Sequence, residues 1–88
     1  MKEIRIIGIH LLDRIKEAGK TQKLLTEYSD YIKTRLGFHE VTSQTCSRNG
    51  LIVIEMRGNK EKWDSLQKKL DEIEGITVKD MNFKLKTD

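Results

Sequence analysis

Two short segments of the chain carry large aliphatic side chains on both faces of an extended backbone, and this pattern limits the fold more than any other. Residues 3–11 hold four isoleucines within six positions, and residues 51–57 begin with four aliphatic residues in a row. Aliphatic and above all β-branched residues favour strands, and successive side chains of a strand point to opposite faces. Because both faces are apolar, the two segments are predicted to be central strands of one sheet.

Two other segments have apolar residues at the three- and four-residue spacing of an amphipathic helix. The first begins near Arg14 after the predicted N-cap Asp13, and the second covers residues 60–74 after Asn59. Gly19 inside the first helix costs about 1 kcal/mol relative to alanine, and we expect it to mark a close approach to the sheet or a later helix start. The predicted buried stripes are Ala18, Thr21, Leu24, Leu25 and Tyr28 in the first helix and Trp63, Leu66, Leu70 and Ile73 in the second.

Two further segments show the two-residue alternation of half-buried strands. They are residues 31–39 and residues 76–85, and in the second the alternation changes at Lys79-Asp80, which predicts a β-bulge. Asn49-Gly50 ends a polar stretch and is typical of a tight turn before a strand. The predicted order is therefore strand, helix, strand, strand, helix, strand.

This order, with right-handed crossovers, predicts an α+β fold: a ferredoxin-like βαββαβ sandwich, with a four-stranded antiparallel sheet and two helices on one face. The first and third strands are central in this topology, which agrees with the two segments that are apolar on both faces. The chain has 88 residues, which is enough for one small domain, and residues 1–88 are predicted to form it.

Composition and charge argue against several classes of protein. No apolar run approaches the roughly 20 residues of a membrane-spanning helix. The one cysteine cannot form an internal disulfide, and with no secretory signal at the N-terminus we expect a cytoplasmic chain. The net charge of +3 arises from positive and negative residues that alternate along the chain, so direct DNA binding is not expected.

Helices on one side leave the other face of the sheet without cover. The face predicted to pack on the helices comprises Ile4, Ile6, Gly8, Ile52, Ile54 and Met56. Large aliphatic residues on the opposite face are each worth about 1.5–3 kcal/mol when buried, so a chain this small is expected to cover them by assembling with itself as a homodimer or homotetramer. The oligomer interface predicted on that face comprises Ile7, Ile9, Tyr31, Arg35, Leu51 and Val53. The alternative is a monomer with ordinary surface aliphatics.

Catalytic and cofactor-binding domains of this architecture carry sequence marks that this chain lacks. A soft-metal chaperone needs paired cysteines after the first strand, and an RNA-recognition sheet needs aromatic residues on its central strands. An Arg- and Gly-rich phosphate loop of the acylphosphatase type is also missing after the first strand. Ser-His-Asp, Cys-His and paired-carboxylate arrangements have no supporting context, so we expect a protein that is not an enzyme.

His39 and Cys46 are the only two soft metal ligands close together in the sequence. A neutral imidazole and a thiolate suit nickel, copper or zinc, but two ligands do not complete a site, so a second chain would have to supply more. The alternative is a surface histidine beside an ordinary loop cysteine. His10, at the end of the first strand, is expected to be structural.

The segment Glu27–Phe38, EYSDYIKTRLGF, resembles the helix-to-strand junction of the iron-only hydrogenase system regulators. In that family Tyr/Phe-x-Asp, then isoleucine, then Arg-x-Gly recur at this spacing. The resemblance runs from about Ile4 to Phe83 and includes the Ile-Gly-Ile first strand and the Gly-Ile-x-Val entry to the last strand. It implies a short ferredoxin-like protein that acts in regulation, as a transcriptional regulator.

The same fold resembles the C-terminal, metal-sensing domain of nickel-responsive regulators. On that pattern His39 falls on a metal-binding histidine, and Cys46 lies within one residue of the ligand cysteine. The other two ligand positions fall at about Thr26 and Gly37, which cannot serve, so a complete square-planar site is not implied. We expect no room for the DNA-binding domain that precedes the sensing domain in those regulators, so regulation would act through a partner or an assembled surface.

Together, the residues and the resemblance predict a homo-oligomeric regulatory module without enzymatic activity that senses a small ligand or metal at a subunit interface. The alternative is a structural dimerisation or adaptor domain that binds no ligand. A polar cavity near His39 or near the loop after Leu11 would favour sensing, whereas a tightly packed interface without a cavity would favour the adaptor.

Overall fold

The computed structural model describes residues 2–38 and 49–85. The predicted metal ligands His39 and Cys46 therefore lie outside the described residues. The helices and strands follow one another in the predicted order: β1 (Lys2–Leu11), α1 (Arg14–Glu27), a 3-10 turn η1 (Ser29–Tyr31), β2 (Ile32–Phe38), β3 (Gly50–Met56), α2 (Lys60–Asp71) and β4 (Ile76–Leu85).

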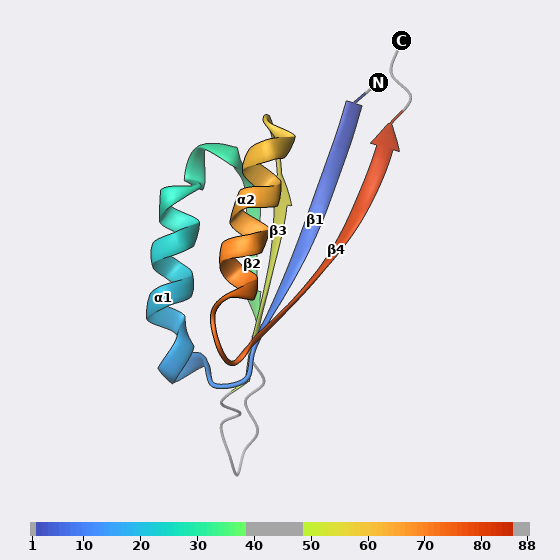
Figure 1. Cartoon of the computed structure of the whole chain (residues 1–88). Coiled ribbons are helices and arrows are strands. Elements are labelled where there is room, and N and C mark those ends of the chain that lie inside the picture. Colours follow the sequence, from blue (N-terminus) through green and yellow to red (C-terminus); the bar gives the residue numbers. More distant parts are fainter. Residues whose placement is uncertain (1, 39–48, 86–88) are drawn as a thin grey trace.

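The four strands form one antiparallel sheet in the order β2-β3-β1-β4. Both helices lie on the same side of this sheet (Figure 1). β1 and β3 are the central strands, as their apolar sequences predicted. The architecture is the predicted ferredoxin-like βαββαβ fold.

The face of β1 that packs on the helices is the opposite of the predicted one. Ile7 and Ile9 are fully buried, and they pair with Ile54 and Ile52 of β3. Directly paired residues of antiparallel strands lie on the same side of the sheet, so the buried face of β3 brings these two isoleucines to the helices. The prediction was right for β3 and wrong for β1, because a shift of one residue in the pairing exchanges the two faces of a strand.

Both helices begin and pack as their sequences predicted. The carboxylate of Asp13 accepts a hydrogen bond from the backbone N–H of Lys16 at 3.3 Å, and the side-chain oxygen of Asn59 accepts one from the N–H of Glu61 at 2.8 Å. Such caps satisfy backbone donors that the helix leaves without partners. The buried residues that cover the sheet are Thr21 and Leu25 of α1, Tyr28 directly after α1, and Trp63, Leu66 and Leu70 of α2.

The predicted bulge in β4 was wrong, since β4 pairs with β1 in a single register along its whole length. The alternation changes because Asp80 and Asn82 lie on the helix side of the sheet, where polar partners meet them. The irregularity is in β2 instead, between Ile32 and Thr34. As a result Ile32 packs on the core, whereas Leu36 lies on the uncovered face opposite Val53 of β3.

Gly19 lies on an exposed part of α1, so the predicted close approach to the sheet was wrong. A Cβ atom added there would meet no atom within 4 Å. Gly19→Ala should therefore raise the free energy of unfolding by about 0.5–1 kcal/mol, because alanine loses less backbone entropy in a helix than glycine. Urea denaturation followed by circular dichroism measures this change.

Gly58→Ala is the control for that substitution, because Gly58 has a φ of 81°. An L-residue with a side chain rarely adopts this conformation, so alanine at this position should destabilise the fold. A variant with alanine at position 19 that is no more stable than the wild type would contradict the prediction.

Candidate functional site

Most of the large apolar side chains that the described chain exposes lie on the uncovered face of the sheet. Met81 and Phe83 of β4 are 58% and 47% exposed, and Leu36 of β2 is 53% exposed. Concentrated apolar surface of this kind marks interaction sites in soluble proteins. We call the following eight residues of the uncovered face the apolar patch: Ile4, Ile6, Leu36, Leu51, Val53, Met81, Phe83 and Leu85.

The outer ends of β1 and β4 carry the apolar patch beyond the rest of the sheet. β3 ends opposite Arg5, so Lys2–Ile4 pair with β4 only. These ends project past the helices as a two-stranded ribbon (Figure 1). Ile4 lies opposite Phe83 on this ribbon. The apolar patch therefore extends onto a part of the sheet where only β1 and β4 pair.

Four of the predicted interface residues are divided between the uncovered face and the core. Leu51 and Val53 of β3 lie on the uncovered face, as predicted. Ile7 and Ile9 have no exposed surface, so their assignment to that face was wrong. Residues buried between the sheet and the helices cannot contact a second chain without unfolding the core.

The other two predicted interface residues lie on the helix side of the sheet. The guanidinium of Arg35 donates a hydrogen bond to the side-chain oxygen of Gln22 in α1. The ring of Tyr31 lies 6.0 Å from Nζ of Lys62 in α2. Tyr31 and Arg35 are therefore placed away from the apolar patch. For Arg35 the reason is the irregularity in β2, which changes which of its later residues face the helices, whereas Tyr31 lies before β2, in η1.

The sequence prediction missed the contribution of β4 to the uncovered face. Met81, Phe83 and Leu85 alternate with Asn82 and Lys84. This alternation predicted a half-buried strand, but it was not used to decide which side of the sheet the three apolar residues face. Paired with β1, it would also have placed Ile4 and Ile6 on the uncovered side.

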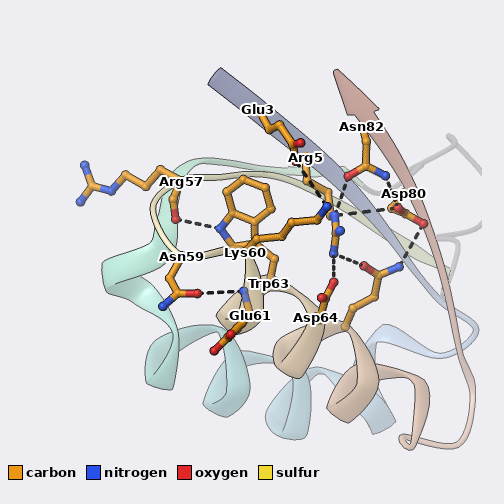
Figure 2. Close-up of polar contacts among 11 residues, drawn as sticks. Glu3, Arg5, Arg57, Asn59, Lys60, Glu61, Trp63, Asp64, Asp80 and Asn82 are labelled. Carbon is orange, nitrogen blue, oxygen red and sulfur yellow. Dashed lines mark hydrogen bonds and ion pairs between the residues drawn. The ribbon is translucent and has the colours of Figure 1, made fainter. Parts of the chain in front are cut away.

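A buried arginine lies on the other side of the same strands (Figure 2). Arg5 is only 6% exposed, although it lies at the outer end of the core. Its Nη1 is 2.6 Å from Oδ1 of Asp64 in α2, and its Nε donates to Oδ1 of Asn82 in β4 at 2.7 Å. The guanidinium carbon also lies 5.6 Å from the centre of the Trp63 ring. The paired charge and the hydrogen bonds offset the cost of removing the guanidinium from water.

Asp80 completes this polar cluster. The side-chain amides of Gln67 and Asn82 donate to its two oxygens at 3.0 and 2.9 Å. These hydrogen bonds, together with the positive charge of Arg5 at 3.9 Å, lower the pKa of the Asp80 carboxyl below its usual value. The cluster ties β4 to α2 through side chains, because Asp80 and Gln67 come from different elements.

The lowered pKa of Asp80 predicts how stability depends on pH. A carboxyl group whose pKa is lower in the folded chain stabilises the fold above its unfolded pKa of about 3.9, and this contribution is lost as the pH falls through the folded pKa. Asp80→Asn should therefore be less stable than the wild type near neutral pH, and the difference should shrink in acid. Urea denaturation of both proteins between neutral pH and pH of about 2 measures it; a difference that is constant over this range would contradict the prediction.

A hollow of about 540 Å³ lies beside the loop after β1. The backbone N–H of Leu12 donates to the carbonyl oxygen of Gly75 at 2.9 Å, which holds this loop against the connection between α2 and β4. The sequence indicated two places where a polar cavity would favour ligand sensing, near His39 and near the loop after Leu11. This hollow lies at the second of them. The polar and charged residues at this hollow are Asp13, Lys16, Lys20 and Glu74.

Within residues 2–38 and 49–85, no group of three or more His, Cys, Asp or Glu residues could hold a metal ion. In the same part of the chain, no helix is long and apolar enough to cross a membrane. His10 is exposed on the uncovered face, opposite Leu51 and Thr77.

The fold and the apolar patch define a small ferredoxin-like domain with one covered and one uncovered sheet face. The family model described as "TM1266-like: Iron-only hydrogenase system regulator, putative" matches residues 3–80 of the chain. The match covers all elements up to the middle of β4, and the chain belongs to this family, as the resemblance of its sequence implied. None of the curated proteins matches the chain significantly.

Two solved structures show the same fold. The uncharacterized protein TM1266 from Thermotoga maritima superposes with a TM-score of 0.79 at 24% identity, over 94% of this chain and 100% of that one. A formyltetrahydrofolate deformylase from Pseudomonas putida KT2440 gives a TM-score of 0.57 at 14% identity, over 89% of this chain and 28% of the deformylase. At these identities the likeness shows the fold, not a shared activity.

Proposed function

We propose that this chain is a regulatory module that assembles with copies of itself through the apolar patch and has no enzymatic activity of its own. The apolar patch is the observation that carries the proposal. Membership of a family described as regulators of the iron-only hydrogenase system supports the regulatory role. Regulation would act through an assembled surface or a protein partner rather than through direct contact with DNA.

A second copy of the chain is the occupant that we propose for the apolar patch. Full burial of a large apolar side chain is worth about 1.5–3 kcal/mol, so covering a residue that is half-exposed, such as Met81 or Phe83, contributes about 1 kcal/mol. In a two-fold symmetric dimer each residue contributes twice. A small domain has little stability to spare, and self-association adds stability without adding residues to the chain.

We propose in addition that the module senses a small ligand, and that ligand binding biases its assembly or its contact with a partner. The hollow beside the loop after β1 supports sensing over a purely structural adaptor. Its lining combines Lys16 and Lys20 with Asp13 and Glu74, which suits a polar ligand better than a protein side chain. A metal at His39 and Cys46 stays a prediction for residues outside the described part of the chain.

Size-exclusion chromatography with light scattering over a dilution series tests the assembly. We expect a mass two or four times that of the chain, falling toward the monomer mass at high dilution. A monomer at every concentration would contradict assembly. Thermal-shift measurements with metals, amino acids and nucleotides test sensing, and an assembled protein that responds to none of them would indicate the adaptor instead.

A further inference from the structure

β4 presents an open edge of the sheet along its whole length. It is the last strand in the sheet order, and among residues 2–38 and 49–85 it pairs with β1 alone. Figure 1 shows it as the outermost strand, on the side away from α1. Its pairing with β1 keeps one register from Ile76 to Leu85, and the strand contains no proline. The backbone N–H and C=O groups on the outer side of such a long, regular edge are a template for a further strand.

The opposite edge of the sheet, formed by β2, is less suited to pairing with a copy of itself. Its register against β3 shifts between Ile32 and Thr34, and an irregularity of this kind bends an edge away from an incoming strand. The charged residues of β2 are Lys33 and Arg35, without a carboxylate. A symmetric pairing of β2 with itself therefore opposes no unlike charges.

β4 is complementary to itself in one antiparallel register. A two-fold axis at Asn82 places Asp80 of each copy opposite Lys84 of the other, on the helix side of the sheet. The same register places Met81 opposite Phe83 on the uncovered face. Unlike charges and apolar pairs directly across two strands each stabilise a sheet, and two-fold symmetry makes each pair occur twice.

The neighbouring registers do not combine these matches within β4. With the axis at Asp80, two aspartates face each other, and with the axis at Met81, Lys79 faces Phe83. With the axis at Phe83, Asp80 is opposite position 86, which lies outside the described residues. Within Ile76–Leu85, the register centred on Asn82 is therefore the one that opposes unlike charges.

The two charged groups of this register are available to a second chain. The side chain of Asp80 is one-third exposed and accepts hydrogen bonds from two side-chain amides, which leaves acceptor sites on its two oxygens. Lys84 is exposed. Its neighbour on β1 is Glu3, whose carboxylate is already 3.4 Å from Nζ of Lys60. The ammonium of Lys84 can therefore turn to Asp80 of another copy.

We propose that a second copy of the chain pairs with the outer edge of β4, with the two-fold axis at Asn82. The two four-stranded sheets then form one continuous antiparallel sheet. Because this axis is perpendicular to the sheet, the helices of both copies lie on one side, and their apolar patches join on the other.

The edge contact rests on the proposed function in one respect, that the chain assembles with copies of itself, and it adds a second contact to that of the apolar patch. Two edge-paired dimers that pack through their joined apolar patches form a tetramer. Phe83 takes part in both contacts, because it lies opposite Met81 at the edge and is exposed on the uncovered face.

Cysteine cross-linking tests the register. Cys46 is the only cysteine of the chain, so Cys46→Ser gives a background without thiols. In this background Met81→Cys and Phe83→Cys are prepared separately, mixed in urea, refolded together and oxidised. Disulfide-linked dimers should form in the mixture and not in either protein alone, because only directly opposite residues lie within disulfide reach. Cross-linking of one protein alone, or none in an assembled mixture, would overturn the register.

Asn82→Cys in the same background distinguishes the edge contact from a contact between uncovered faces. Its thiol would lie at the two-fold axis on the helix side of the sheet, where packing of the apolar patches cannot bring two copies together. It should therefore cross-link with itself, with circular dichroism as the check that the variant is folded. A mixture that cross-links while folded Asn82→Cys does not would overturn the edge contact.

Leu36→Glu isolates the edge contact for measurement. Leu36 is 53% exposed in the apolar patch and lies on β2, at the far side of the sheet from β4. This variant should lose the contact between faces and remain an edge-paired dimer by light scattering. A Leu36→Glu monomer that does not cross-link, beside an assembled wild type, refutes only the edge contact. A cross-linked wild-type dimer whose mass Leu36→Glu leaves unchanged refutes only the assembly through the apolar patch.

In the Leu36→Glu background, Lys84→Glu should weaken dimerisation at least about tenfold. The substitution replaces two unlike charge pairs by two like ones, which destabilise paired strands. Lys79→Glu is the matched control, because it makes the same change of charge on the same strand but faces Leu85 in this register. It should change the dissociation constant less than about threefold. Equal effects of the two variants would overturn the proposed register.

Discussion

Replacement of Phe83 by glutamate is expected to leave the chain monomeric at concentrations at which the wild type is assembled. Phe83 is 47% exposed on the ribbon formed by β1 and β4, so its burial in an interface contributes about 1 kcal/mol per copy and about 2 kcal/mol per symmetric dimer. The two glutamates would add the cost of removing carboxylates from water. The total loss of at least about 3 kcal/mol corresponds to a dissociation constant that rises more than hundredfold.

Light scattering over a dilution series measures this change, and circular dichroism shows whether the variant is folded. Leu12→Glu is the matched control, because Leu12 is 66% exposed but lies outside the sheet, in the loop after β1. It should assemble like the wild type. An assembled Phe83→Glu protein, or an equal loss of assembly in both variants, would contradict an interface at the apolar patch.

Arg5→Ala is expected to lower the free energy of unfolding by about 2–3 kcal/mol. The substitution removes hydrogen bonds to Asp64, Gln67 and Asn82, and bonds to charged groups contribute about 1.5–3 kcal/mol each. Asp64 is 63% exposed, so water replaces part of what it loses. The alanine would also leave space beside Trp63, which loses its contact with the guanidinium.

A loss of this size lowers the melting temperature of a domain of about 90 residues by roughly 10–20 °C. Calorimetry at a fixed protein concentration measures it, since self-association makes the melting temperature depend on concentration. Arg35→Ala is the control, because it removes an exposed arginine whose side chain makes one hydrogen bond among residues 2–38 and 49–85, to Gln22, and it should cost less than about 0.5 kcal/mol. Equal losses in the two variants would show that the buried cluster around Arg5 contributes no more to the free energy of unfolding than the exposed Arg35 does.

Arg5→Met separates the volume of the side chain from its charge. Methionine fills most of the space of the arginine stem, and well-packed apolar residues often replace buried ionic groups at little cost. We therefore expect a smaller loss of stability than in Arg5→Ala. A loss as large as that of the alanine variant would mean that the hydrogen bonds, rather than the packing, account for the effect.

Local sequence patterns were sufficient to predict the helices and strands and their order along the chain. The caps Asp13 and Asn59 and the buried stripes of both helices act within a few residues of one another along the chain. Trp63 was identified as a core residue for the same reason, because its spacing from Leu66 and Leu70 is that of one helix face. The topology followed from the order and from the handedness of the crossovers.

The candidate site was predicted only in part. An uncovered sheet face with Leu51 and Val53 was expected, and both residues lie on it. Ile7 and Ile9 were predicted to lie on the uncovered face, and Ile4 and Ile6 in the core. The structure has the reverse, and the sequence could not decide because isoleucine occurs on both faces of β1.

The amino-acid sequence determined which segments are strands and helices, because those periodicities are properties of neighbouring residues. Only the folded chain decided which face of β1 became the core and that an arginine would be buried there. A strand offers two equivalent faces, and pairing with residues far along the chain selects one of them. For Arg5 the selecting partners, Asp64 and Asn82, lie 59 and 77 residues away.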